Sequence, residues 1–204
     1  MPDIENRPTP PAGLRPPPSP WIARFAPLVR AGGPVLDLAC GGGRHLRHFL
    51  GRGHAVTGVD LDLRGVADLA GTPGVELVAA DLEQGNPWPL PGRRFAAVIV
   101  ANYLHRPLLD ALAAALEPGG LLLYETFMRG NGRFGRPSSP DFLLRSGELL
   151  EFARGRLQVI AFEQGEVSSP KAAVVQRLAA CAPVPAPDLD GEPEPRPLPG
   201  PLPA

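Results

Sequence analysis

Three acidic residues stand where apolar stretches of this chain break or end, and a run of glycines lies among them. Asp37 interrupts a short apolar run that leads into three glycines at 41–43, and Asp60 and Asp81 follow the next two apolar runs. A carboxylate accepts hydrogen bonds from hydroxyl and amino groups, and glycine lets a backbone approach a ligand closely. Together these residue types favour a binding site for a ligand that carries such groups.

The glycine run lies between a predicted strand and a predicted helix. Val35–Leu38 has the composition of a strand buried in a parallel sheet, and Leu46, Phe49 and Leu50 recur at helical spacing over 44–52. The first turn of such a helix presents unpaired N–H groups and a positive dipole end, which is typical of nucleotide binding. Leu46 occupies the place of the third glycine in the dinucleotide fingerprint, which argues against NAD.

Asp37 lies inside the apolar strand, where a buried carboxylate is unfavourable unless it is hydrogen-bonded or meets a cation. It therefore either holds the turn through backbone N–H groups or faces a positively charged ligand. Asp60 ends the second predicted strand and is suited to accept both hydroxyls of a ribose. An adenosine-containing cofactor is expected on this basis.

Apolar and turn-rich segments alternate along the rest of the chain. The patterns predict strands over 35–38, 55–60, 75–80, 95–101, 121–127, 157–163 and 172–180. They predict a short helix that Ser19 caps, one that Ser146 caps over 147–152, and others over 44–52, 63–70 and 108–116. Five strand–helix alternations and a final hairpin around Gly165 and Pro170 indicate an α/β fold. Its core is a single doubly wound, seven-stranded, mostly parallel sheet with helices on both faces.

The stretch V-L-D-L-A-C-G-G-G-R at 35–44 resembles the first motif of the class I S-adenosylmethionine-dependent methyltransferases, and the resemblance extends over roughly residues 35–128. It implies a Rossmann-like methyltransferase fold, S-adenosyl-L-methionine as cofactor and S-adenosyl-L-homocysteine as product. It also implies a set of cofactor contacts, namely Asp37, Ala39, Gly41, Gly43, Asp60, Leu61, Asp81, Leu82 and Asn102.

Two contacts that the resemblance implies have alternative interpretations. Asp81 would accept from the exocyclic amine of adenine, with the amide of Leu82 at a ring nitrogen, but Asp81 also suits a turn or a helix cap. The N-terminal helix is similar to a segment that closes over the cofactor in many of these enzymes. Trp21 is therefore expected either to line the site or to pack in the core.

Polar residues follow the predicted strand 95–101, at the sheet edge where open α/β folds bind ligands. Asn102, Tyr103 and His105 are the candidate catalytic residues. His105 is the candidate general base, because histidine titrates near neutrality, and the other two are expected to orient the acceptor. A loop histidine without a chemical role is the alternative. No group of His, Cys and acidic residues has metal-ligand spacing, so no metal is expected.

The loop at 128–140 contains Arg129, Arg133 and Arg136 and no acid among them. It either grips an anionic substrate or is a solvated basic loop. The run Y-E-T-F-M-R-G-N-G-R-F-G-R-P at 124–137 resembles a subset of small bacterial methyltransferases near the tellurite-resistance type, which implies a lid over the site.

Composition limits the classes of protein that fit. The net charge of −1 gives no long-range attraction for nucleic acid, and no apolar run reaches the length of a membrane span. Two distant cysteines and the lack of a secretory signal at the N-terminus favour a cytoplasmic protein. Of 28 prolines, eight lie in 1–20 and nine in 183–204. Disordered proline-rich tails are therefore expected at 1–18 and 183–204, around a methyltransferase domain at 19–182.

Three functional hypotheses follow. The first is a methyltransferase that acts on a small molecule, and the second is an RNA or protein methyltransferase, which only the arginine loop favours. The third is a non-catalytic module that binds S-adenosylmethionine or S-adenosylhomocysteine and acts through its proline-rich tails. The first is preferred because the chain has neither a basic net charge nor an added recognition domain.

Overall fold

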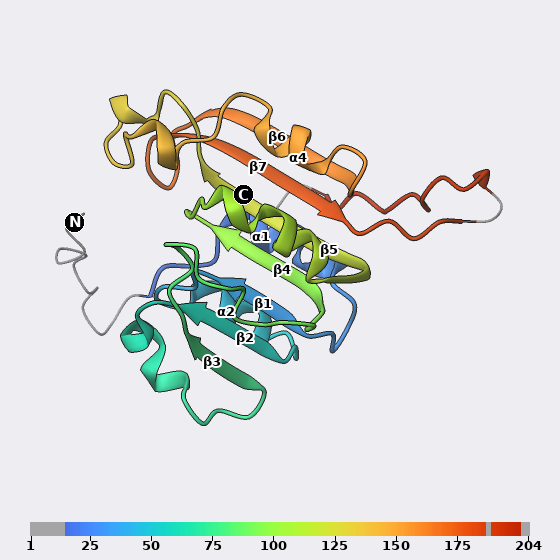
Figure 1. Ribbon diagram of the computed structural model, residues 1–204, viewed down its shortest axis with the longest axis horizontal. Coiled ribbons are helices and arrows are strands. Elements are labelled where there is room, and N and C mark those ends of the chain that lie inside the picture. Colours follow the sequence, from blue (N-terminus) through green and yellow to red (C-terminus); the bar gives the residue numbers. More distant parts are fainter. Residues whose placement is uncertain (1–14, 187–188, 201–204) are drawn as a thin grey trace.

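The structure is a computed structural model that describes residues 15–186 and 189–200. Its centre is a seven-stranded sheet in the order β3-β2-β1-β4-β5-β7-β6 (Figure 1). The strands are β1 Val35–Leu38, β2 Val56–Asp60, β3 Val75–Ala79, β4 Phe95–Ala101, β5 Leu116–Phe127, β6 Gln158–Val167 and β7 Ala173–Cys181. The first five pair in parallel, whereas β7 is antiparallel to both β5 and β6. The predicted fold class is thereby confirmed.

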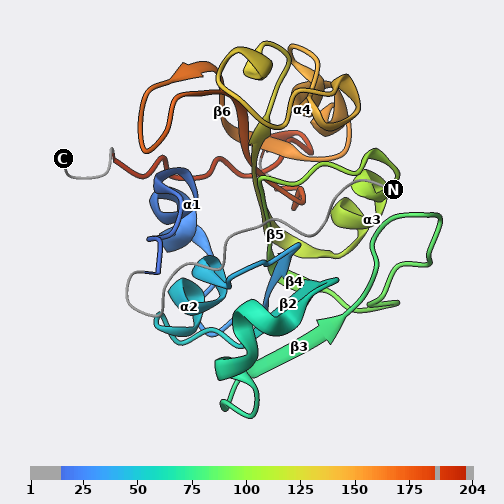
Figure 2. The same ribbon diagram turned by 90° about the vertical axis from the view of Figure 1, so that its left-hand side faces the viewer.

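Helices cover both faces of this sheet. Figure 2 shows α1 and α2 on one side and α3 and α4 on the other. Their bounds are α1 Pro20–Phe25, α2 Arg44–Leu50, α3 Leu109–Ala114 and α4 Glu148–Ala153, with 3-10 helices η1 Ala26–Leu28, η2 Leu63–Leu69, η3 Arg106–Leu108, η4 Asn131–Arg133 and η5 Pro140–Phe142. Within the described residues, no helix is long and apolar enough to span a bilayer.

Two hydrophobic cores separate along the central strand β4. Val98 and Val100 point to one core, beside residues of α3 and α4, and Ala97 and Ile99 point to the other, beside residues of α1 and α2. The alternation is the two-residue period of a strand, and burial on both faces explains why the whole strand is apolar. The sheet is therefore a rigid platform whose carboxyl edge carries the loops.

The two serines predicted to cap helices differ in position. Ser19 stands at the N-cap of α1, as predicted, but among the described residues its buried hydroxyl has no hydrogen-bond partner, and its backbone amide donates to His45 Nε2 at 3.2 Å. The N-cap of α4 is Gly147, in the left-handed region at φ 71°. The Ser146 hydroxyl instead accepts from Gln164 Nε2 at 3.0 Å. A tertiary partner on β6 thus takes the Ser146 hydroxyl away from a capping role.

Other boundaries shift where tertiary pairing extends an element. The predicted helix at 63–70 is the 3-10 helix η2, and the predicted helix at 108–116 ends at Ala114 because Leu116 already pairs with β4. β6 continues through Gly165 to Val167, so the hairpin turn lies at 168–172.

The C-terminal stretch from 183, predicted to be a disordered tail, makes contacts with the sheet. Pro185 and Pro193 form an isolated antiparallel bridge. Gln158 Nε2 donates to the Glu194 carbonyl at 3.0 Å, and Arg196 donates to the Gly119 carbonyl at 3.4 Å. Contacts with the sheet therefore continue past the predicted boundary at 182. The tail residues 1–14, 187–188 and 201–204 lie outside the described residues.

Candidate active site

A cavity of about 600 Å³ lies at the carboxyl ends of β1 to β4. The loops after all four strands contribute to its wall, as the topology of a doubly wound sheet requires. Its lining residues are Pro16, Ala39, Cys40, Gly41, Gly42, Arg44, His45, Asp60, Leu61, Ala80, Asp81, Leu82, Glu83, Gln84, Ala101, Asn102, Tyr103 and Phe142. Most of the cofactor contacts expected from the sequence are thus brought together here.

The glycine turn forms one wall of the cavity through left-handed backbone conformations. Ala39 has φ 53°, Gly41 has φ 54°, and Gly43 has φ 70° at the N-cap of α2. A non-glycine residue is disfavoured in this region, so the conformation of Ala39 marks a strained exit from β1. Gly43 is buried behind the turn and does not line the cavity, unlike Ala39 and Gly41.

Leu46 fits beside the glycine turn because its neighbour on β2 is Gly58, which has no side chain. A Cβ atom added to Gly58 would lie 2.6 Å from Leu46 Cδ1, so the leucine occupies the space beside a glycine of the strand. Gly65 of η2 similarly backs the turn, since its added Cβ would lie 2.9 Å from the Gly41 carbonyl. The close approach of helix and strand thus depends on a glycine of the strand.

Asp60 joins the glycine turn to the loop after β2. One carboxylate oxygen accepts the Gly41 amide at 2.7 Å, and the other accepts the Asp62 amide at 3.0 Å. These two bonds fix the carboxylate at the cavity wall. A carboxylate has about four lone-pair sites, so both oxygens keep the capacity to accept from a ligand.

Asp37 is only 2% exposed, and its Oδ2 has no hydrogen-bond partner in the described residues. Burial raises the pKa of this carboxyl to about 7, against the lowering effects of the Leu46 amide and Arg44. Burial also lowers the pKa of His45 to about 3, which keeps its ring neutral although Nδ1 lies 3.9 Å from Asp37. Asp37 is therefore a buried acid without a cationic partner, directly beneath the turn.

Asp81 makes the contacts of a turn residue and also lies at the cavity wall. Its oxygens accept from the Glu83 amide at 2.9 Å and the Gln84 side chain at 3.4 Å, as in a turn. Its carboxylate also lines the cavity, with the buried Leu82 beside it. A turn of this kind holds the carboxylate in one orientation.

The candidate catalytic residues differ in their positions. Asn102 and Tyr103 line the cavity, and Asn102 has φ 58°, which turns the chain sharply at the end of β4. The Tyr103 hydroxyl is buried and has no hydrogen-bond partner in the described part of the chain, and burial, then the charge of Glu83, raises its pKa above the ordinary value. His105 lines none of the cavities described here and has no hydrogen bond from its ring among the described residues.

Trp21 packs in the core and does not line the cavity. It is 3% exposed, lies 4.6 Å from the Phe25 ring between centroids, and donates from Nε1 to the Leu178 carbonyl at 3.4 Å. The N-terminal segment borders the cavity through Pro16 instead, with Arg15 paired to Asp68 at 2.9 Å. The expectation that Trp21 lines the site is therefore wrong, because the apolar face of α1 points toward the sheet.

Two further cavities adjoin the first. One of about 750 Å³ shares Asn102, Tyr103, Glu83 and Phe142 with it, and one of about 200 Å³ shares Arg44 and Asn102. Asn102 borders all three. Sequence reasoning missed Phe142 and Lys171 in these walls, since an exposed aromatic residue and a lysine after a predicted hairpin give no signal by themselves.

The three arginines of the loop at 128–140 have different surroundings. Arg136 lines both adjoining cavities, whereas Arg133 pairs with Glu166 at 2.8 Å and Arg129 is exposed away from them. Arg133 is thus a solvated surface residue, and Arg136 is available to a ligand.

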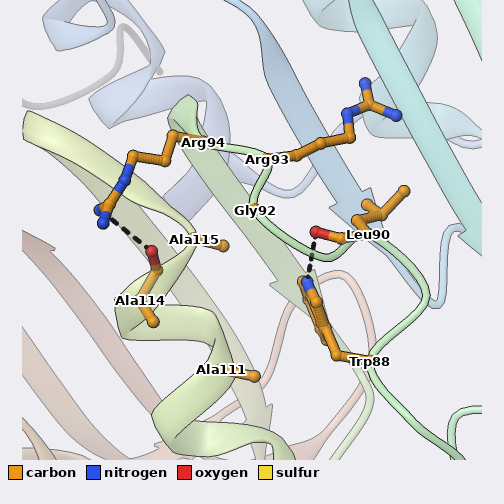
Figure 3. A pocket seen from close by; sticks show the side chains of 8 residues that line it. All are labelled: Trp88, Leu90, Gly92, Arg93, Arg94, Ala111, Ala114 and Ala115. Atoms are coloured by element: carbon orange, nitrogen blue, oxygen red, sulfur yellow. Dashed lines mark hydrogen bonds between the residues drawn. The ribbon is translucent and has the colours of Figure 1, made fainter.

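A fourth cavity, of about 310 Å³, lies at the other edge of the sheet (Figure 3). Trp88, Leu90 and alanines of α3 line it, and Arg94 closes one side by donating to the Ala114 carbonyl at 3.2 Å. It has no acid, histidine or nucleophile, so it is separate from the chemistry of the carboxyl edge. Among the described residues, no three His, Cys, Asp or Glu side chains gather as a metal site requires.

Comparisons with known proteins agree with this geometry. Residues 35–120 match the family model described as a methyltransferase domain. No curated protein sequence matches the chain.

Solved structures share the fold. TehB from Haemophilus influenzae has a TM-score of 0.63 at 18% identity over 78% of this chain, which spans 61% of the length of TehB. The glycopeptide N-methyltransferase MtfA, solved with sinefungin, has a TM-score of 0.56 at 23% identity, with 80% of this chain and 94% of MtfA covered. The N-methyltransferase NodS from Bradyrhizobium japonicum WM9 has a TM-score of 0.57 at 16% identity, covering 79% of this chain and 93% of NodS. Residues 35–120 of this chain thus match a methyltransferase domain, and the chain shares its sheet and fold with these solved structures.

Proposed function

We propose that this protein transfers a methyl group from S-adenosylmethionine to a small-molecule acceptor. The observation that carries the proposal is the cavity at the carboxyl edge, where a glycine turn and two strand-end acids meet and which two further cavities adjoin at Asn102. The first is suited to the cofactor, and the adjoining ones are suited to the acceptor.

The lining residues fit the chemical groups of the cofactor. The two oxygens of Asp60 are suited to the ribose hydroxyls, and Asp81 with the Leu82 amide is suited to adenine. The glycine turn is suited to the methionyl part. Asp37 lies buried beneath the turn and is not among the residues that line the cavity, so it is suited to hold the turn in place. When bound, the cofactor supplies an electrophilic methyl group.

The protein's own contribution is alignment and the exclusion of water. Methyl transfer from a sulfonium is an in-line displacement, so positioning accounts for most of the catalysis. Asn102 and Tyr103 border both the first cavity and the adjoining cavity of about 750 Å³, so they are suited to orient the acceptor. His105 lines none of the three cavities, and the proposal assigns it no proton transfer. An acceptor that is already a neutral amine, a thiolate or another anion needs no general base.

Calorimetry with Asp60→Ala tests the cofactor assignment. We expect S-adenosylmethionine and S-adenosylhomocysteine to bind, NAD not to bind, and the variant to weaken cofactor binding by at least ~1.5 kcal/mol through loss of charge-assisted hydrogen bonds. Asp62→Ala is the matched control, because Asp62 is on the same loop and pairs with the exposed Arg64 at 2.6 Å. Equal cofactor affinities of the two variants would refute the assignment of Asp60.

Transfer of label from methyl-labelled S-adenosylmethionine then tests catalysis. The candidate acceptors to be tested are amines, thiols, hydroxyl compounds, RNA and protein. Amines are included because MtfA and NodS are named as N-methyltransferases. Label in small molecules supports the proposal. Label in RNA or protein alone, or binding without any transfer, contradicts it and favours the macromolecular or the non-catalytic hypothesis.

A further inference from the structure

The cavity of about 200 Å³ beside the cofactor edge has an excess of positive charge. Arg44, Arg136 and Lys171 all line it, and among residues 15–186 and 189–200 none of the three has a carboxylate within 4.0 Å. They come from α2, from the loop after β5 and from the turn between β6 and β7. Folding thus brings together three cations that are distant in sequence.

The acid in this wall does not neutralise them. Glu125 is 8% exposed and pairs with Arg177 Nε at 2.6 Å, and Arg177 also reaches Glu163 at 3.3 Å. This pair is internally compensated and lies on adjacent strands of the sheet. The charge that remains toward the cavity is therefore that of the other three residues.

Apolar side chains complete the same wall. Phe127, Phe134, Val167 and Val175 line it beside the cations. A pocket of this composition fits a small molecule with an apolar body and one anionic group, because apolar surface binds the body and cations fix its orientation. Arginine in particular presents paired donors that match the oxygens of a carboxylate or phosphate.

We propose that the methyl acceptor is a small organic anion whose carboxylate or phosphate binds Arg136 and Lys171, with its nucleophilic atom at Asn102. The inference rests on the proposed function and names its substrate class. Arg44 borders both this cavity and the cofactor cavity, so it lies between the anion and the methyl donor. The neighbouring Arg133 is already paired, which argues against an extended nucleic-acid surface along this loop.

Anion-exchange fractionation of a small-molecule extract from the source cells tests whether the acceptor is an anion, and the acceptor need not be identified for this test. Each fraction is incubated with the protein and methyl-labelled S-adenosylmethionine, beside separate RNA and protein fractions. We expect labelled product only from the fractions that the exchanger retains at neutral pH.

Charge variants then test the residues. With the active fraction as substrate, Arg136→Gln and Lys171→Gln should each raise KM about tenfold, since a hydrogen bond to a charged group contributes about 1.5 kcal/mol or more, while the calorimetric affinity for S-adenosylhomocysteine stays unchanged. Lys171→Arg should retain most of the wild-type KM because it keeps the charge. Arg133→Gln is the matched control on the same loop and should behave as wild type.

The outcomes are distinguishable. Transfer to an acceptor in the unretained fractions overturns the anionic acceptor, while the proposed function stands. Transfer to RNA or protein alone overturns both the anionic acceptor and the proposed small-molecule function. A KM in Arg136→Gln and Lys171→Gln equal to that of Arg133→Gln overturns the role of this cavity. No transfer from any fraction refutes the proposed function, and the inference falls with it.

Discussion

Replacing Asp37 by Asn should flatten the dependence of folding stability on pH. In the folded chain this carboxyl is buried beneath the glycine turn, and burial raises its pKa from 3.8 to about 7. The groups that face it are the neutral His45, the Arg44 guanidinium and the Asp60 carboxylate. Asn has nearly the same shape and still accepts from the Leu46 amide, but it does not ionise.

The magnitude follows from proton linkage. Because the folded pKa is above the unfolded one, the stabilising contribution of Asp37 is complete below the unfolded pKa and is lost as pH rises through about 7. The full difference corresponds to roughly 4 kcal/mol, of which about 3 kcal/mol falls between about pH 5 and about pH 8. His45 has the opposite sign, since burial lowers its pKa to about 3 and its contribution is lost as pH falls. That contribution is common to the wild type and the variant.

Urea unfolding of both chains across this pH range, without cofactor, measures the effect. We expect the free energy of unfolding of the wild type to fall relative to that of Asp37→Asn by up to about 3 kcal/mol as pH rises. Asp62→Asn, which removes an exposed acid from a neighbouring loop, should run parallel to the wild type. Parallel pH profiles for the wild type and Asp37→Asn would refute the placement of a proton on the buried carboxyl.

Two further substitutions test how the site is held. Gly58→Ala should destabilise the fold by about 1–3 kcal/mol, because its new Cβ would lie 2.6 Å from the buried Leu46. In a double-mutant cycle measured by urea unfolding, Leu46→Ala should recover part of that loss. Strictly additive effects of the two substitutions would show that residues 58 and 46 are not in contact. Arg106→Gln should cost about 3 kcal/mol in the same assay, because Arg106 pairs with the buried Glu148 at 2.6 Å and donates to the Leu143 carbonyl at 3.0 Å. Arg133→Gln, which breaks an exposed pair, is its control, and an equal effect of both changes would contradict the structural role of the Arg106 pair.

Much of the fold could be predicted from local patterns of apolar and polar residues. The continuous apolar run of β4 predicted a central strand, and its two-sided burial is the physical reason for that pattern. Asp60 and Asp81 could be placed at one edge because the ends of parallel strands meet there. The cap predicted at Ser146 is wrong because its hydroxyl accepts from Gln164, a tertiary partner that local sequence does not reveal, and Gly147 is the N-cap of α4 instead.

The sequence by itself determined the order of elements, the glycine turn and the acids beside it, because these depend on residue type and short-range spacing. Only the tertiary structure decided which side chains share a cavity. Trp21 lies in the core and not at the site, because the apolar face of α1 packs against the sheet. Leu46 fits because the residue beside it on β2 is a glycine. Arg44, Arg136 and Lys171 come from three separate segments and line one cavity. Such neighbours are set by packing between segments distant in sequence, and no local spacing encodes that packing.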